Sequence, residues 1–167
     1  MTHRSPLVIG LGNPDRGDDA VGAAVARAVA AQRPTVEVVE HEDPTAVLDL
    51  WAGHSPVVVV DAVRSGAAAG TVHRLATGRG GPPISTQAWA HVGQGGTHGI
   101  GLAEIVELAR ALGRLPERLV VIGVEAERFD HGAPLSAAVA AAVPVAVEQI
   151  GRELERVDDL EAHDVPR

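Results

Sequence analysis

Four ionisable residues stand where they could carry chemistry together. Asp18 and Asp19 follow an apolar run near the N-terminus, Asp61 closes the run VVVVD, and His98 precedes the segment GIGLAEIVELA. Two carboxylates and one imidazole form an incomplete coordination shell for a borderline divalent ion such as nickel or zinc. Such a shell leaves positions open for water or for a group of a substrate. These residue types therefore indicate a site that recognises or uses a metal ion.

The four residues can meet only if the elements that carry them share one edge of a sheet. Apolar runs bounded by Gly, Pro or charge predict strands at residues 7–11, 36–40, 57–60, 71–75 and 119–124. Helical periodicity predicts helices over residues 21–29, 44–51, 102–112 and 135–157. This order predicts an α/β protein with a three-layer α/β/α domain. In such a sheet the crevice lies beyond the carboxyl ends of the parallel strands, so all four residues can face one rim.

The domain organisation follows from the same pattern. We expect one domain over residues 1–157, with an acidic, disordered tail at 158–167. The link 64–70 is too short for a crossover helix, so the strand after it is predicted to be antiparallel. Residues 76–97 lack periodicity and form a long loop of the kind that is usually functional. Pro144 lies inside the last predicted helix and should kink it.

Each candidate residue also has an ordinary structural role open to it. Asp18 or Asp19 could simply cap the first helix, because Asp is favoured at that position. His98 could face solvent in its glycine-rich loop. Asp61 is harder to explain in this way, since an acid after four valines is poorly solvated unless it is paired or functional. Asn13 is expected to shape the turn beneath the site.

Composition and motif spacing exclude several classes of protein. A net charge of -8 disfavours nucleic acid, and the absence of cysteine excludes disulfides and thiolate chemistry. The chain has no run of apolar residues long enough for a signal peptide or membrane span, so we expect a cytoplasmic protein with no membrane partner. The motif GLGNPDRGDD lacks the third glycine of a dinucleotide fingerprint and has Asp18 where a P-loop has lysine. Thr45 interrupts an HExxH pattern, and GxSxG is absent.

Four ordered segments carry a resemblance to a known family. GLGNPDRGDDAVG, VVVVDAVRSG, THGIGLAEIV and GVEAERFDHGAPLSAAV resemble, in that order, the [NiFe]-hydrogenase maturation endopeptidases. The resemblance implies a phosphorylase/hydrolase-like fold whose five-stranded sheet is mixed and mostly parallel. It also implies an endopeptidase that removes a C-terminal extension from the hydrogenase large-subunit precursor after nickel insertion. Nickel would be carried by the substrate rather than be a resident cofactor, and other divalent ions would be able to replace it.

The resemblance also assigns the candidate residues. It places the metal-binding and catalytic roles on Asp19, Asp61 and His98. The first of these is often glutamate in the family, and the Asp-Asp pair leaves Asp18 and Asp19 as alternatives. His91 is a rival to His98, although it lacks the GxGL continuation. Loop 76–97 and the rim around Arg64 are expected to contact the partner.

Two other functions are compatible with parts of the sequence. A non-catalytic nickel-sensing chaperone or checkpoint module would use the same three ligands. Peptidyl-tRNA hydrolase shares the GLGNP opening, but it needs a basic surface for tRNA, which a chain of net charge -8 does not offer.

Overall fold

The computed structural model describes residues 4–84 and 101–162. Within these residues the strands form one mixed sheet in the order β2-β1-β3-β5-β4. The strands are β1 (Leu7–Leu11), β2 (Glu37–His41), β3 (Val57–Val63), β4 (Val72–Thr77) and β5 (Leu119–Glu125). All neighbouring pairs are parallel except β4 with β5, which confirms the predicted antiparallel strand.

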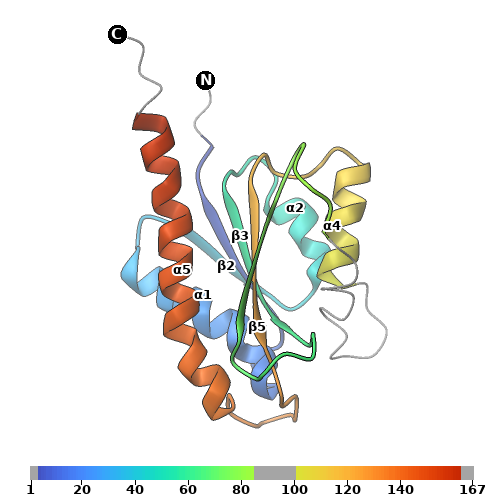
Figure 1. The fold of residues 1–167 in the computed structure, drawn as a ribbon, viewed down its shortest axis with the longest axis vertical. Helices are drawn as coiled ribbons and strands as arrows, with labels where there is room; N and C mark the ends of the chain where they lie inside the picture. Colours follow the sequence, from blue (N-terminus) through green and yellow to red (C-terminus); the bar gives the residue numbers. More distant parts are fainter. Residues whose placement is uncertain (1–3, 85–100, 163–167) are drawn as a thin grey trace.

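Helices cover both faces of this sheet and complete the predicted three layers (Figure 1). One face carries α1 (Val21–Gln32) and α5 (Ala137–Ala162), and the other carries α2 (Val47–Leu50) and α4 (Leu102–Ala111). Short 3-10 turns, η1 (Gly17–Ala20) and η2 (Pro44–Ala46), precede α1 and α2. The carboxyl ends of the parallel strands lie at the bottom of Figure 1, at the opposite end from the chain termini.

Alternating residues of the central strands fill two separate cores. In β3, Val58 and Val60 pack with the helices α1 and α5, while Val57 and Val59 pack with α2 and α4. Both sets are fully buried. A strand covered on both faces has no solvent side, which explains why the sequence of β3 is continuously apolar rather than alternating.

Glycines allow α1 to lie unusually close to the sheet. A Cβ atom added to Gly22 would lie 2.1 Å from the carbonyl oxygen of Leu11 and 2.9 Å from that of Val60. A Cβ atom added to Gly10 would lie 2.3 Å from the carbonyl oxygen of Gly22. The first turn of α1 therefore rests directly on β1 and β3, and this contact brings the preceding turn η1 to the edge of β3.

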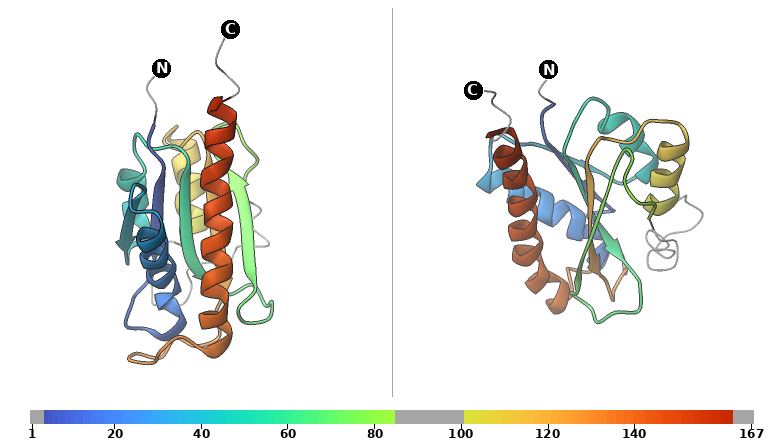
Figure 2. Two further views of the ribbon diagram at one scale, coloured as in Figure 1. Left: turned by 90° about the vertical axis from the view of Figure 1, so that its left-hand side faces the viewer. Right: turned by 45° about the horizontal axis from the view of Figure 1, so that its top comes forward.

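Several boundaries differ from the predicted ones. β3 continues to Val63, because its pairing with β5 extends to the pair Val63 and Glu125. β4 reaches Thr77, two residues into the segment that lacked periodicity. The last helix continues to Ala162, so the expected domain boundary at residue 157 falls inside α5 (Figure 2). None of the described helices combines the length and apolar character needed to cross a membrane.

Candidate functional site

Asp61 is a buried carboxylate near the carboxyl end of β3. Its residue is 4% exposed, and the backbone N–H of Ala62 donates to its Oδ1 at 2.9 Å. Burial, with a further contribution from the charge of Asp19, raises the pKa of Asp61 to about 8. The strand continues two residues beyond it, so the expectation that Asp61 closes the strand is wrong by two positions. The acid nevertheless lies at the predicted edge of the sheet.

Asp19 is the second carboxylate of the site. It lies in η1, and the backbone N–H of Asn13 donates to its Oδ2 at 2.9 Å. Burial raises its pKa, although the Asn13 hydrogen bond and the charge of Arg16 oppose that rise. Because the charge of Asp19 raises the pKa of Asp61, the two carboxylates lie near enough for their charges to repel. This places Asp19, rather than Asp18, with Asp61.

Asp18 has a different role from the one the sequence suggested. Its side chain is fully buried and accepts hydrogen bonds from the backbone N–H groups of Glu127, Arg128 and Ser136 and from the Ser136 hydroxyl. Burial alone would raise its pKa, but these hydrogen bonds outweigh burial and lower it. The predicted N-cap role is wrong for both acids, since Ala20 is the N-cap of α1 and no side chain caps it. Asp18 instead holds the loop between β5 and α5.

The turn beneath the site is built by Gly12 and Asn13. The side-chain Oδ1 of Asn13 accepts from the backbone N–H of Asp15 at 2.8 Å, which confirms its turn-shaping role. Gly12 has φ +119°, and a Cβ there would lie 2.1 Å from the carbonyl oxygen of Asp19. Only glycine permits both this backbone conformation and this contact. The glycine motif therefore positions Asp19 rather than a phosphate.

Asp19 and Asp61 are carboxylates that could hold a divalent cation together. Two carboxylates that repel each other share at least one proton near neutral pH, and a divalent cation can replace that proton and remove the repulsion. The predicted third residue, His98, and its rival His91 lie outside the described residues. Among residues 4–84 and 101–162, no group of three His, Asp or Glu side chains could hold a metal ion. Of the three residues predicted as ligands, Asp19 and Asp61 therefore lie within the described part of the chain, and their role as ligands stays a prediction.

Sequence reasoning named the rim around Arg64 but missed the aromatic and arginine cluster that Arg64 forms beside these acids. The guanidinium of Arg64 lies 4.2 Å from the centre of the Phe129 ring, and that of Arg16 lies 5.5 Å from it. The Nε of Arg16 also donates to the Phe129 carbonyl at 3.2 Å. A signal was present, since Phe129 is the one phenylalanine of the chain and stands near its charged rim. We call these three residues the Phe129 cluster.

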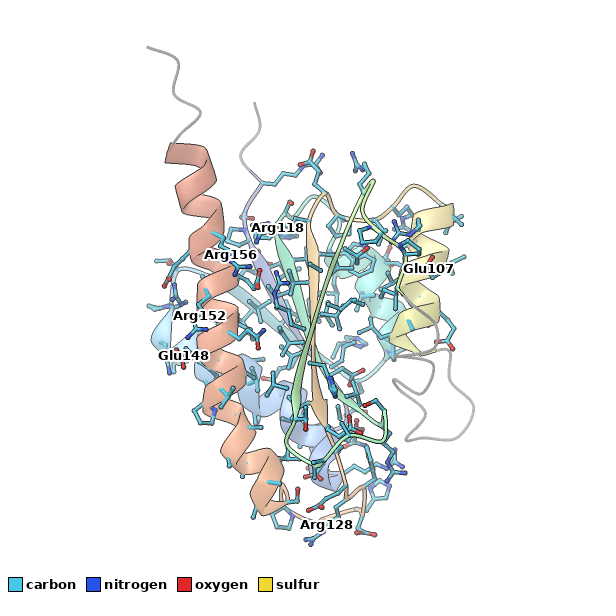
Figure 3. The ribbon with its side chains drawn as sticks, viewed as in Figure 1. Glu107, Arg118, Arg128, Glu148, Arg152 and Arg156 are labelled. Atoms are coloured by element: carbon cyan, nitrogen blue, oxygen red, sulfur yellow. The ribbon has the colours of Figure 1, made fainter. Side chains whose placement is uncertain are left out.

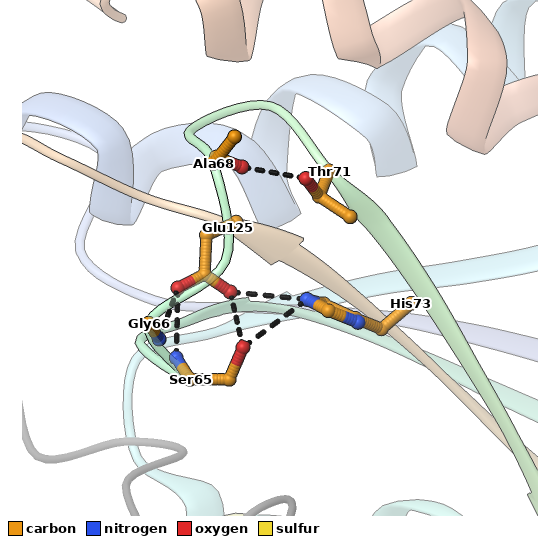
Figure 4. Close-up of polar contacts among 6 residues, drawn as sticks. All are labelled: Ser65, Gly66, Ala68, Thr71, His73 and Glu125. Carbon is orange, nitrogen blue, oxygen red and sulfur yellow. Dashed lines mark hydrogen bonds and ion pairs between the residues drawn. The ribbon is translucent and has the colours of Figure 1, made fainter.

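A second missed residue, Glu125, fixes the link that follows β3. Its carboxylate accepts from the backbone N–H groups of Ser65 and Gly66 at 2.7 and 3.1 Å and from the Ser65 hydroxyl at 2.9 Å (Figure 4). The Nε2 of His73 lies 3.0 Å from the same carboxylate. Burial would raise the pKa of Glu125, but these hydrogen bonds lower it. This buried acid fixes the backbone that carries Arg64.

These features gather at one end of the molecule. The loop of Arg128 lies at the carboxyl end of the sheet, far from Arg118 and Arg156 at the other end (Figure 3). Those two arginines and Arg74 surround the buried Glu153, which is an ion cluster separate from the candidate site.

Comparisons with known proteins agree on one family. A family model described as hydrogenase maturation protease matches residues 42–153. The hydrogenase maturating endopeptidase HybD from E. coli has a TM-score of 0.68 and 25% identity, covering 92% of this chain and 93% of that one. The [NiFe] hydrogenase maturation protease HybD from Thermococcus kodakarensis has a TM-score of 0.68 and 26% identity, covering 90% and 99% of the two chains. The [NiFe] hydrogenase maturation protease HycI from Thermococcus kodakarensis KOD1 has a TM-score of 0.67 and 25% identity, covering 90% and 92%. No curated protein sequence matches significantly.

Proposed function

This chain belongs to the hydrogenase maturation protease family and is a protease, and on that premise we propose that it removes the C-terminal extension of a [NiFe]-hydrogenase large-subunit precursor after nickel insertion. In this proposal nickel is part of the substrate, and Asp19, Asp61 and His98 recognise it. Segment 76–97, of which residues 85–97 lie outside the described residues, and the rim around Arg64 contact the precursor.

The observation that carries the proposal is the carboxylate pair at the carboxyl end of the sheet. Burial raises the pKa of both Asp19 and Asp61, and the charge of Asp19 raises that of Asp61 further, so the pair holds a proton near neutral pH unless a cation replaces it. Such a pair suits a protein that tests whether its substrate carries a divalent ion. The ion would remove the repulsion between the two carboxylates, so the loaded substrate would bind more strongly than the empty one. Asp18 and Asn13 keep the pair in place through their hydrogen bonds.

The position of Asp61 also fits a third ligand from the chain before α4. Val57, Val59 and Val63 pack with α2 and α4, so strand alternation places Asp61 on that face of the sheet. The helix α4 packs on the same face and begins at Leu102, four residues after His98 in the sequence. This supports His98, with His91 as the alternative, as the imidazole partner of the two acids.

The test uses the full chain and its large-subunit precursor, loaded with nickel or left empty. We expect intact-mass spectrometry to show loss of a C-terminal peptide from the nickel-loaded precursor only. Asp19→Asn, Asp61→Asn and His98→Ala should each abolish cutting, whereas Asp49→Asn, at a side chain 89% exposed on α2, should not.

Two results would contradict the proposal. Equal cutting of the loaded and empty precursor would remove the role of nickel. Stable nickel-dependent binding without any loss of mass would indicate the checkpoint module instead.

A further inference from the structure

The Phe129 cluster leaves arginine hydrogen-bond donors free beside the carboxylate pair. Arg64 is exposed and stacks on the ring, and Arg16 is half-buried on the same ring. Within the described residues, no carboxylate forms an ion pair with either guanidinium. Most other arginines of the described chain are paired with an acid, as Arg27 is with Glu40 at 2.8 Å. In a chain of net charge -8, Arg64 stacks on Phe129 without an acid partner among the described residues, so its guanidinium is available for an external anion.

Two buried acids hold the two halves of this cluster in place. Asp18 accepts four hydrogen bonds from the loop that carries Phe129, including that from the N–H of Arg128 at 2.9 Å. Glu125 accepts three hydrogen bonds from Ser65 and Gly66, directly after Arg64. Both carboxylates are almost completely buried, at 0% and 2% exposure. Their hydrogen bonds therefore fix the Arg64 and Phe129 backbones before any substrate arrives.

The charge of the site explains what such a cluster would do. Asp19 and Asp61 repel any anionic peptide that approaches the rim, and Arg16 already interacts with Asp19 electrostatically. An arginine stacked on an aromatic ring keeps its planar edge free to bind a carboxylate with two hydrogen bonds. An anionic group bound there would be held beside the carboxylate pair while remaining separate from it.

We propose that Arg64, supported by Phe129 and Arg16, binds a carboxylate of the substrate's C-terminal segment. This inference rests on the proposed function and names the chemistry by which the protease recognises the segment that it removes. The carboxylate is either the free C-terminus of the precursor or an acidic side chain within the extension. Both sources present the same group to the guanidinium, and the experiment distinguishes them.

The experiment measures cutting of the nickel-loaded precursor by the wild-type protein and by Arg64→Ala, Arg64→Lys and Arg128→Ala. We expect Arg64→Ala to raise KM about tenfold with little change in kcat, the size of one lost charge-assisted hydrogen-bond pair. Arg64→Lys should be intermediate, because lysine keeps the charge but not the planar stacking. Arg128→Ala is the matched control, since this exposed arginine lies next to Phe129 on the loop after β5 and should leave KM unchanged.

Competitor peptides with the sequence of the precursor's own extension identify the carboxylate. Three forms are compared: the free acid, its C-terminal amide, and a form with Asn and Gln in place of Asp and Glu. The form that inhibits the wild type and Arg64→Ala equally lacks the carboxylate that Arg64 binds. Equal inhibition by all three forms, or an unchanged KM in Arg64→Ala, would overturn this inference while the protease function stands. A wild-type protein that cuts no precursor would overturn the proposed function and this inference with it.

Discussion

Replacing Asp61 by asparagine should stabilise the metal-free protein, and the gain should grow with pH. The folded-state pKa of Asp61 is raised from 3.8 to about 8, first by burial and then by the charge of Asp19. A carboxyl group whose pKa is higher in the folded than in the unfolded protein stabilises the fold at pH values below its pKa in the unfolded protein. That contribution is lost as pH rises through the folded value. The asparagine side chain in Asp61→Asn would resemble the protonated acid at every pH, so the variant would not lose stability as pH rises.

The size of the effect follows from the two pKa values. Each tenfold change in the ionisation constant corresponds to about 1.4 kcal/mol. Between about pH 4 and pH 8 the wild type should therefore lose about 1.4 kcal/mol per pH unit relative to Asp61→Asn. Over the whole range the difference reaches roughly 6 kcal/mol, which is comparable with the total stability of many domains. Above about pH 8 the difference should level off.

Urea unfolding in the presence of a chelator measures this difference directly. Midpoints and slopes at about pH 5, 6.5 and 8 give the free energy of unfolding for each variant. Asp19→Asn should show a smaller gain than Asp61→Asn, because it removes only the neighbouring charge and leaves Asp61 buried. Asp49→Asn, at an exposed acid, should follow the wild type at all three values. A constant difference between wild type and Asp61→Asn across this pH range would refute the reasoning about this acid.

Three further predictions concern the supports of the site and its metal affinity. Gly22→Ala should destabilise the protein by about 1–3 kcal/mol in urea unfolding, because the added Cβ meets the Leu11 carbonyl; no loss would contradict the packing of α1. Asp18→Asn should cost about 2–4 kcal/mol and speed hydrogen exchange of the loop after β5, since its buried carboxylate accepts four hydrogen bonds; unchanged exchange would contradict its role. Calorimetry with Ni²⁺ alone should show affinity rising from about pH 6 to 8 with proton release, because the ion displaces the proton of the Asp19–Asp61 pair; a flat profile would count against that pair.

Most of the fold could be predicted because its signals are local. Continuous valine runs predict strands covered on both faces, and the short link 64–70 predicts the antiparallel β4; the structure confirms both. The errors lie at the ends of elements. Val63 belongs to β3 because of its partner on β5, and a partner of that kind is not visible in the sequence of the strand itself. The extension of α5 to Ala162 was missed because the sequence from Asp158 onward is rich in acidic residues, which indicated a tail.

The site was predictable only where topology decides it. The rule that crevices lie beyond the carboxyl ends of parallel strands placed Asp61 and the Asp18–Asp19 pair at one edge. It did not decide which of the two neighbouring acids faces Asp61. That choice depends on residues 127–136, which lie more than a hundred positions away and supply the hydrogen bonds of Asp18. The Phe129 cluster escaped prediction for the same reason, because Arg64 and Phe129 meet only in the folded chain.

The hydrogen bonds that each acid receives, more than its burial, separate the candidate reactive group from the structural ones. Asp18, Asp61 and Glu125 are all at most 4% exposed, so burial disfavours the charged form of each. Asp18 and Glu125 each accept at least three backbone or hydroxyl hydrogen bonds, and their pKa values are lowered. Asp61 accepts one within residues 4–84 and 101–162, from the next backbone N–H, and its pKa rises to about 8. Of these three buried acids, Asp61 is therefore the one whose negative charge receives the least compensation from hydrogen bonds. Asp18 and Glu125 fix the loops around Asp61. The position of the hydrogen-bond donors, rather than that of the carboxylates, therefore decides which buried acid has the raised pKa.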